Sequence, residues 1–306
     1  MSQVKLNHVL VVCGPTASGK SGLACDLALK FNGEIINADS RQIYKELSIG
    51  VDKPAADQRK LVPHHLYDIV SLREHFNVAK YVSLADAVVE DVVSRGKLPI
   101  FVGGTGLYLR AFLFGLFDTV PVDESVRLRL KERQEQYGLT FLHEELKIKD
   151  PAASERIHPH DSVRILRALE IFETTGKTIS DWQTAHGFQK ARYEYTKLAY
   201  SIPREILYRQ INQRVLEMMA QGLQKEVEEL YQSFPNNEVL LKTIGYAQWQ
   251  DYFKGLQSLD RTIELIQQDS RKFAKRQLTW FNKEKDINWF KPAEGEKILT
   301  FVLKMI

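Results

Sequence analysis

The sequence has few of the features that mark secreted and membrane proteins. Its 306 residues include two cysteines, Cys13 and Cys25, and neither belongs to a C-x-x-C pair that would indicate a zinc site. We expect both to be small buried hydrophobes. No apolar run approaches the roughly 20 residues that span a bilayer, and the first residues lack the regions of a signal peptide. We therefore expect a cytoplasmic protein with no membrane partner.

A strong excess of charge of either sign is also absent. The chain has 42 Lys and Arg against 39 Asp and Glu, a formal net charge of +3. This balance neither demands nor forbids a nucleic-acid partner, so any basic surface must be local. The hydrophobic and charged fractions, 44% and 26%, are those of an ordinary globular protein, and the length allows one large domain or two smaller ones.

A glycine-rich segment follows the first apolar run. Residues 14–21, GPTASGKS, match G-x-x-x-x-G-K-[ST], the phosphate-binding loop. Residues 9–13 before it are typical of a buried strand and residues 22–29 after it of a helix, which is the order that this loop requires. A chance glycine turn is the alternative. The predicted phosphate-binding site, whose phosphorylated ligand the loop alone leaves open, comprises Gly14, Pro15, Thr16, Ala17, Ser18, Gly19, Lys20 and Ser21.

Strands alternate with helices in the first part of the chain. Residues 34–39, 63–70 and 97–102 are predicted strands, and residues 77–95 form a predicted helix. This alternation predicts a parallel sheet that binds ligands beyond the carboxyl ends of its strands. Because Gly14, Asp39 and Thr105 each follow such an end, we expect an active site where three strand tips converge.

The pattern changes at about residue 120, where strand candidates give way to helices. One helix is predicted to begin at Asp161-Ser162 and to end at Gly176. A strand at 197–202 and two amphipathic helices, at 204–220 and 223–233, follow. We therefore predict an α/β fold, a P-loop NTPase-like parallel sheet flanked by helices, with an all-helical insertion. The predicted catalytic core is 1–119 with 197–306, and the predicted insertion is 120–196.

Two polar residues at predicted strand ends have alternative interpretations. Asp39 could bind Mg²⁺ or act as a general base, or it could cap a helix N-terminus. Thr105 stands in a glycine-dense turn, where its hydroxyl could contact a ligand or face solvent.

Two basic segments are equally open to interpretation. In residues 270–281, Arg271 and Lys275 lie one helical turn apart, as do Lys272 and Arg276, and such a face suits a phosphate backbone. Composition alone favours a solvated amphipathic helix whose aromatic residues belong to the core.

The arginines of the predicted helix after Asp161 raise the same question. Glu170 and Glu173 lie close enough on that helix to pair with Arg164 and Arg167, so a structural role is credible.

Taken together, these segments resemble the tRNA dimethylallyltransferases, the tRNA isopentenyltransferase family, over nearly the whole chain. Residues 14–21 reproduce the family's form of the phosphate loop, which alone is not specific. The ordered set is specific. Its further members are residues 39–44 (DSRQIY), 103–108 (GGTGLY), 156–161 (RIHPHD), 167–170 (RALE) and 274–280 (AKRQLTW).

The resemblance implies transfer of a dimethylallyl group from dimethylallyl diphosphate to the exocyclic amine of the adenosine 3′ of the anticodon. By the family pattern, Asp39 accepts the proton of the amine and Thr105 helps to hold the flipped-out base. Lys20 and Arg214 would steady the diphosphate leaving group, and Ser21 would be a ligand to Mg²⁺.

The implied partner is the tRNA anticodon stem-loop, bound by a monomeric enzyme. Val163 stands where the family usually has glutamine, and Ala247 where arginine or lysine is common. The basic pattern adds Lys275 and Arg276 to the predicted contacts. The implied tRNA-binding residues are Asp39, Ser40, Arg41, Gln42, Thr105, Arg127, Val163, Arg164, Ile165, Leu166, Arg167, Lys242, Thr243, Ile244, Gly245, Tyr246 and Ala247.

Two other functions remain compatible with parts of the pattern. A nucleoside or nucleotide kinase would share the loop, the sheet and Mg²⁺, although no arginine-rich lid is evident in the sequence. An RNA-binding protein that only senses nucleotides would not need Lys20, Asp39 and Thr105 together.

Overall fold

The computed structural model describes residues 8–116, 123–187 and 190–306. The chain divides into two compact units, one of Met1–Leu113 with Arg192–Ile306 and one of Phe114–Ala191. The predicted boundary at 119/120 lies outside the described residues, and the predicted return at residue 197 falls within a strand that begins at Glu194.

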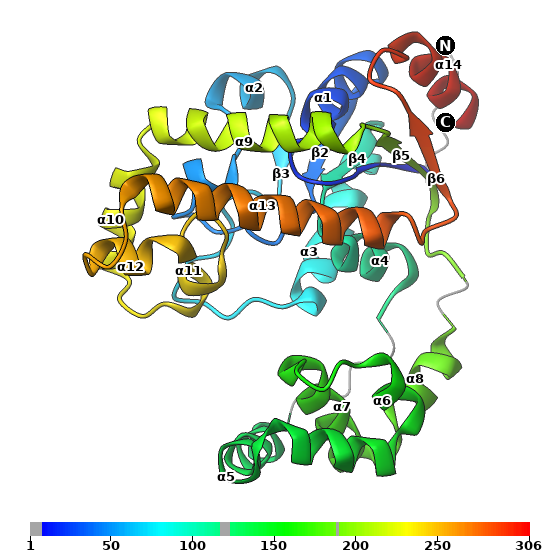
Figure 1. Cartoon of the computed structure of the whole chain (residues 1–306). Coiled ribbons are helices and arrows are strands. Elements are labelled where there is room, and N and C mark those ends of the chain that lie inside the picture. Colours follow the sequence, from blue (N-terminus) through cyan, green and yellow to red (C-terminus); the bar gives the residue numbers. More distant parts are fainter. Residues whose placement is uncertain (1–7, 117–122, 188–189) are drawn as a thin grey trace. The chain divides into compact units, whose positions relative to one another are not determined.

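The larger unit is built on one parallel sheet (Figure 1). Within the described residues the strand order is β3-β2-β4-β1-β5-β6, and every recorded pairing is parallel. The predicted α/β class is therefore confirmed. The strands are β1 (His8–Cys13), β2 (Gly33–Asn37), β3 (His64–His65), β4 (Leu98–Gly103), β5 (Glu194–Tyr200) and β6 (Ile287–Phe290).

Helices cover both faces of this sheet, which explains why the central strands are continuous apolar runs. The helices of the larger unit are α1 (Lys20–Phe31), α2 (Ala56–Leu61), α3 (Val78–Ser94), α4 (Gly106–Phe114), α9 (Arg204–Ala220), α10 (Leu223–Ser233), α11 (Glu238–Lys242), α12 (Gln250–Phe253), α13 (Leu259–Phe281) and α14 (Gly295–Met305). Two short 3₁₀ helices, η1 (Ile49–Val51) and η2 (Ala247–Trp249), complete the set.

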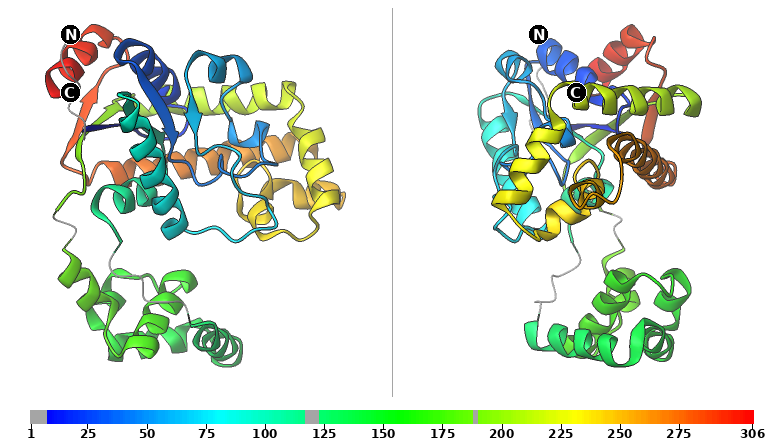
Figure 2. Two further views of the ribbon diagram at one scale, coloured as in Figure 1. Left: turned by 180° about the vertical axis from the view of Figure 1, so that it is seen from behind. Right: turned by 60° about the vertical axis from the view of Figure 1, so that its left-hand side comes forward.

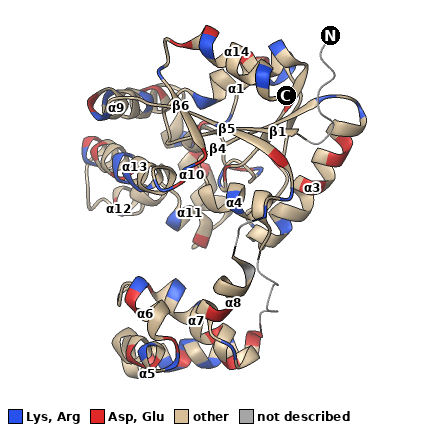
Figure 3. Cartoon of the chain, turned by 90° about the vertical axis from the view of Figure 1, so that its right-hand side faces the viewer, with Lys and Arg blue, Asp and Glu red and all other residues tan. Residues whose placement is uncertain are grey.

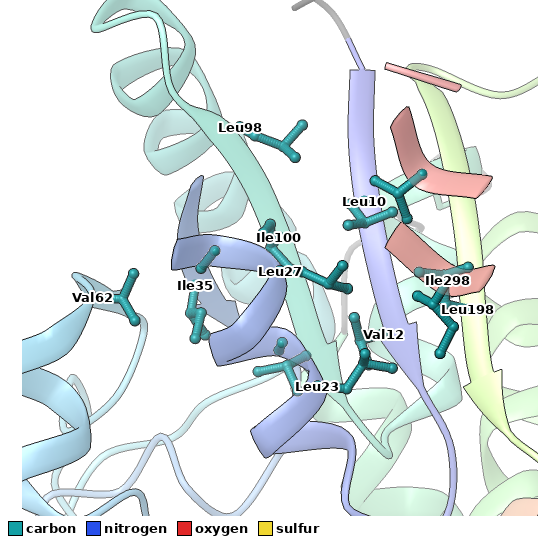
Figure 4. Close-up of a cluster of buried hydrophobic side chains, with 14 of the residues drawn as sticks. Leu10, Val12, Leu23, Leu27, Ile35, Val62, Leu98, Ile100, Leu198 and Ile298 are labelled. Atoms are coloured by element: carbon teal, nitrogen blue, oxygen red, sulfur yellow. The ribbon is translucent and has the colours of Figure 1, made fainter. Parts of the chain in front are cut away.

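The two faces of the sheet carry different cores. On one face, Leu27 of α1 and Ile298 of α14 pack with Leu10 and Ile100 of the strands (Figure 4). Successive strand residues point to opposite faces, so Phe101 lies on the other side. There its ring stacks on that of Phe112 in α4, with ring centroids 4.2 Å apart.

A second layer of helices adjoins the sheet. Helix α9 packs against α13, and α10 to α12 gather at one end of this pair (Figure 2). Buried Leu47, Val215, Tyr246 and Trp249 belong to the core that joins these helices to the segment after β2. This second core places two long helices beside the loops that follow the strands.

The smaller unit is helical and has a core of its own. Its helices are α5 (Glu124–Lys149), α6 (Pro151–Arg156), α7 (Ser162–Thr175) and α8 (Ile179–His186). Asp161 caps α7 by accepting a hydrogen bond from the Arg164 N–H, and Gly176 ends the helix in a left-handed conformation. Both helix ends were predicted from the sequence and are confirmed.

Three strand predictions need correction. Strand β2 ends at Asn37, so Asp39 lies in the loop beyond it, and residues 63–70 contain only the two-residue strand β3. Strand β5 begins at Glu194 rather than at residue 197. Strand β6 was missed because its four residues, INWF, form no apolar run and take up strand structure by pairing with β5, far away in the sequence.

The cysteines behave nearly as expected: Cys13 is buried in β1, whereas Cys25 is half-buried against the core. Among the described residues, no helix is both long and apolar enough to cross a membrane.

Candidate active site

One cavity of about 330 Å³ in the larger unit brings the predicted catalytic residues together. Its lining includes Lys20 from α1, Asp39 and Thr105 from the loops after β2 and β4, and Arg214 from α9. The predicted convergence of three strand ends is therefore confirmed. The lining also includes Thr16, Ala17, Ser40, Arg41, Lys242, Thr243, Ile244, Gly245 and Arg276 from the predicted binding segments.

Lys20 begins the helix after the glycine loop. Its ammonium donates a hydrogen bond to the Pro15 carbonyl at 3.1 Å, so the side chain folds back along the loop. Burial lowers the pKa of Lys20 to about 8; the nearby Asp39 carboxylate opposes this effect, and Arg214 adds to it. Within the described residues, the buried Ser18 hydroxyl has no hydrogen-bond partner, which fits a loop whose ligand supplies the partners.

The structure gives Asp39 a capping contact of the kind that the sequence left open, although it caps a turn rather than a helix. Its Oδ1 accepts hydrogen bonds from the N–H groups of Arg41, at 2.8 Å, and Gln42, at 3.4 Å, so it caps the turn that follows. Its own N–H donates to Asn37 Oδ1. No donor to Oδ2 is recorded in the described part of the chain.

Thr105 is tied to the same loop. Its Oγ1 accepts a hydrogen bond from the Ser40 N–H at 3.0 Å, and its own N–H donates to the Ala38 carbonyl at 3.2 Å. The hydroxyl is therefore part of the cavity wall rather than simply solvated. These two bonds fix the position of Thr105 relative to Asp39.

Arg214 reaches the glycine loop from α9. One terminal nitrogen, Nη1, donates to Thr16 Oγ1 at 2.7 Å, and its Nε lies 3.3 Å from the Asp52 carboxylate. Asp52 was not predicted, because it stands outside every motif and meets Arg214 only in the folded chain. The guanidinium is thus held at the phosphate loop from two sides.

Several residues near the cavity that were predicted to contact tRNA make hydrogen bonds within the protein instead. The Gln42 amide donates to the backbone carbonyls of Val51 and Asp52 at 2.9 and 2.8 Å. Tyr246 is 0% exposed and its hydroxyl donates to Glu226 at 2.6 Å. In the 242–247 segment Lys242 is exposed, whereas Thr243 and Gly245 are buried like Tyr246. Ala247 begins the short helix η2.

The predicted contacts in the helical unit lie on α5 and α7. Val163 is 77% exposed, Ile165 is 0% exposed in the core of the unit, and Leu166 is half-buried. Arg127 lies 3.8 Å from the carboxylate of Glu170, which also pairs with Arg167 at 3.2 Å.

One predicted ion pair on α7 is wrong. Glu173 pairs with Arg133 of α5 at 2.8 Å rather than with an arginine of its own helix, because the core brings α5 against α7. Arg164 pairs instead with Asp161 at 3.5 Å.

Figure 3 shows basic and acidic positions along α13. The four cations predicted on one face of this helix have different contacts. Arg271 donates to the Asn212 side chain of α9, and Lys272 pairs with Asp269 at 3.2 Å. In the part of the chain that the structure describes, neither Lys275 nor Arg276 has a recorded ion pair, and both are exposed. These two therefore remain the predicted phosphate contacts of this helix.

Sequence reasoning missed the apolar wall of the cavity and one buried amide, Gln277. The wall comprises Ile211, Val215, Met218, Ile266 and Phe273 from α9 and α13. The spacing of 211, 215 and 218 on one helical face was a usable signal, although it also fits an ordinary core face. Nothing in the sequence indicated what Gln277 contacts.

The comparisons with known proteins agree with this geometry. A family model described as IPP transferase matches residues 42–284. The chain is 42% identical over 305 residues to a tRNA dimethylallyltransferase of Geobacter metallireducens, covering 99% of both chains. It is 44% identical over 290 residues to the tRNA dimethylallyltransferase of Geobacillus thermodenitrificans, covering 94% of this chain and 92% of the relative.

Solved structures extend the agreement to the fold. A tRNA isopentenylpyrophosphate transferase of Bacillus halodurans is 34% identical, with a TM-score of 0.73 and coverage of 98% and 96% of the two chains. A eukaryotic dimethylallyltransferase acting on tRNA is 28% identical, with a TM-score of 0.81 and coverage of 93% of this chain and 74% of that one. The similarity confirms the predicted P-loop NTPase-like architecture. The chain belongs to the tRNA dimethylallyltransferase family and is a prenyl-transferring enzyme.

Proposed function

We propose that this enzyme transfers the dimethylallyl group of dimethylallyl diphosphate to the exocyclic amine of the adenosine 3′ of the anticodon in tRNA, with release of diphosphate. Family membership supports the reaction class. The observation that carries the assignment of roles is the convergence of Lys20, Asp39, Thr105 and Arg214 on one cavity.

Asp39 is the proposed proton acceptor. An aromatic exocyclic amine is a poor nucleophile while neutral, so a carboxylate that removes its proton as the N–C bond forms lowers the barrier. The turn holds Oδ1 of Asp39 by two backbone N–H groups and leaves Oδ2 for the amine. Thr105, fixed to the same turn through Ser40, would hold the base beside it.

Lys20 and Arg214 are the proposed stabilisers of the leaving group. As the allylic C–O bond breaks, negative charge develops on the diphosphate, and donors already in position stabilise it without reorganisation. Arg214 is oriented by Thr16 and Asp52, and Lys20 by the Pro15 carbonyl. The backbone of the glycine loop and the start of α1 add their dipoles.

The donor set also fits Mg²⁺. Among the described residues, no group of three or more His, Cys, Asp or Glu could hold a metal by protein alone. Ser21, in the first turn of α1, offers a hydroxyl oxygen of the kind that Mg²⁺ takes together with phosphate oxygens. When bound, Mg²⁺ would neutralise charge on the diphosphate.

The rest of the cavity suits the two substrates. The apolar wall of α9 and α13 would receive the prenyl group, because burying apolar surface is favourable. The adenine must leave its stack to reach the cavity, where Thr105 stands. We propose that Lys275, Arg276, the 242–247 segment and the helical unit contact the tRNA. Monomeric action and a cytoplasmic location stay predictions.

The test is incubation with radiolabelled dimethylallyl diphosphate, Mg²⁺ and tRNA whose anticodon is followed by adenosine. We expect label on that tRNA and none on a matched tRNA carrying guanosine at the same position. Absence of label on both, together with ATP turnover on a nucleoside, would contradict the proposal and favour the kinase.

A further inference from the structure

Gln277 of α13 lies between the two loops that carry the opposite halves of the active site. Gln277 is 6% exposed, and its side-chain amide makes two hydrogen bonds. The Oε1 atom accepts a bond from the Thr16 N–H of the glycine loop at 2.9 Å. The Nε2 atom donates to the Gly104 carbonyl, beside Thr105, at 3.0 Å.

We infer that Gln277 is a positioning residue that sets the distance between the leaving-group side and the acceptor side of the site. The inference rests on the proposed transfer reaction. Gln277 belongs to the cavity lining, and each of its two amide partners adjoins a residue with a proposed role in the reaction. The Thr16 hydroxyl oxygen also accepts a hydrogen bond from the Arg214 guanidinium. Gly104 directly precedes Thr105 in the chain.

The chemistry of the amide explains why glutamine suits this position. The glycine loop presents an N–H and the second loop presents a carbonyl, so the bridging group must accept at one end and donate at the other. The amide of glutamine does both at once. The carboxylate of glutamate only accepts hydrogen bonds. The thioether of methionine, which has a similar length, has no donor and is only a weak acceptor.

The absence of a side chain at Gly104 leaves room for the Gln277 amide. A Cβ on Gly104 would lie 2.2 Å from Gln277 Nε2 and 3.2 Å from the Gly14 carbonyl oxygen. One helical turn further along α13, Trp280 packs in the same way on Gly106, where a Cβ would lie 2.1 Å from Nε1. The helix therefore docks on the second loop at two successive contacts.

These bonds complete a chain of fixed contacts through the site. Thr105 holds the loop of Asp39 through Ser40, and Gln277 holds the loop of Thr16. Without Gln277, no other recorded side-chain bond within the described residues joins the glycine loop to the loop after β4. Its loss leaves the part-buried Thr16 N–H and the buried Gly104 carbonyl unpaired, and it removes this side-chain link between the loops beyond the paired residues Cys13 and Gly103.

A single-turnover experiment tests this inference with Gln277→Met, which keeps the length and removes both bonds. The transfer rate is measured with dimethylallyl diphosphate and tRNA, both saturating, and is normalised to the fraction of protein that binds tRNA. We expect the rate to fall about 10- to 100-fold, because misplacing reacting groups by about 1 Å has effects of that size. The dissociation constants for tRNA and for the diphosphate, each measured alone, should change less than about threefold on the same reasoning.

Gln267→Met is the matched control. Gln267 lies on the same helix and donates to the Asn212 carbonyl of α9 at 3.2 Å, away from both loops. Its normalised rate should equal that of the wild type. If Gln277→Met does not fold, Gln277→Glu takes its place, since the carboxylate keeps the acceptor for Thr16 and loses the donor to Gly104.

The outcomes separate this inference from the proposed function. A wild-type protein that labels no tRNA overturns the proposed function. An active wild type combined with a normalised rate for the Gln277 variant within about threefold of it overturns the positioning role. A loss of rate that disappears on normalisation to binding-competent protein also overturns it, because the amide would then only stabilise the fold.

Discussion

Replacement of Asp39 by asparagine separates the two duties of this side chain. Asp39→Asn keeps an oxygen at the place of Oδ1, which accepts the N–H groups of Arg41 and Gln42, but it cannot take a proton from the amine. Asp39→Ala removes both duties. Comparing the two variants therefore isolates the proposed base from the turn that presents it.

The expected magnitudes differ enough to be distinguished. Loss of a positioned base lowers a rate by about 10²- to 10⁴-fold, which corresponds to about 3–5 kcal/mol of activation free energy. Asp39→Ala also removes the acceptor of the turn. Its free energy of unfolding should therefore be about 0.5–2 kcal/mol lower than that of the wild type. Asp39→Asn should leave that free energy nearly unchanged.

The assay is single-turnover transfer from labelled dimethylallyl diphosphate to tRNA, with urea unfolding measured on the same preparations. A pH near 7 is needed, because the Asp39 carboxylate raises the pKa of Lys20 and its removal favours the neutral amine. Binding of tRNA should persist in both variants. An Asp39→Asn enzyme that transfers within about tenfold of the wild-type rate would refute the role of base.

Three further predictions concern charged groups of the cavity and of helix α13. Arg214→Gln should lower kcat/KM for the diphosphate by about 10²- to 10³-fold in steady-state assays, and an unchanged value would remove it from leaving-group stabilisation. Because burial lowers the pKa of Lys20 to about 8, its charged form is lost as pH rises through that value. Calorimetry with inorganic diphosphate should therefore show affinity falling about tenfold per pH unit above 8, and a flat profile would contradict the role of Lys20. The double variant Lys275→Glu with Arg276→Glu should weaken tRNA binding in filter assays and flatten its dependence on salt by about one to two logarithmic units of slope. Unchanged affinity would instead support a merely solvated helix.

The parts of the protein that were predicted well have local causes. The glycine loop was recognised because strand, loop and helix are contiguous over residues 9–29. The limits of α7 followed from Asp161 and Gly176, whose effects act within one turn of the helix. The convergence of Asp39 and Thr105 followed from a general property of parallel sheets, whose carboxyl ends share an edge.

The errors share a different cause. Strand β6 and the pairing of Glu173 with Arg133 both depend on neighbours that are distant in the sequence. Hydrophobic periodicity reports which face of an element is buried but not which element covers it. The same limit hid Asp52, because a lone acid in a loop has no signal until Arg214 lies beside it.

The sequence by itself determined the chemistry at the start of α1 and the identity of the groups after β2 and β4, since those depend on residue type and on a few neighbours along the chain. Only the tertiary structure decided how these groups are held in place. Gln277 stands 261 residues from Thr16 and 173 from Gly104 in the sequence, yet its side-chain amide makes hydrogen bonds to both. Such a contact requires α13 to dock on the loops in one register, and that register is set by packing over the whole core rather than by any local pattern.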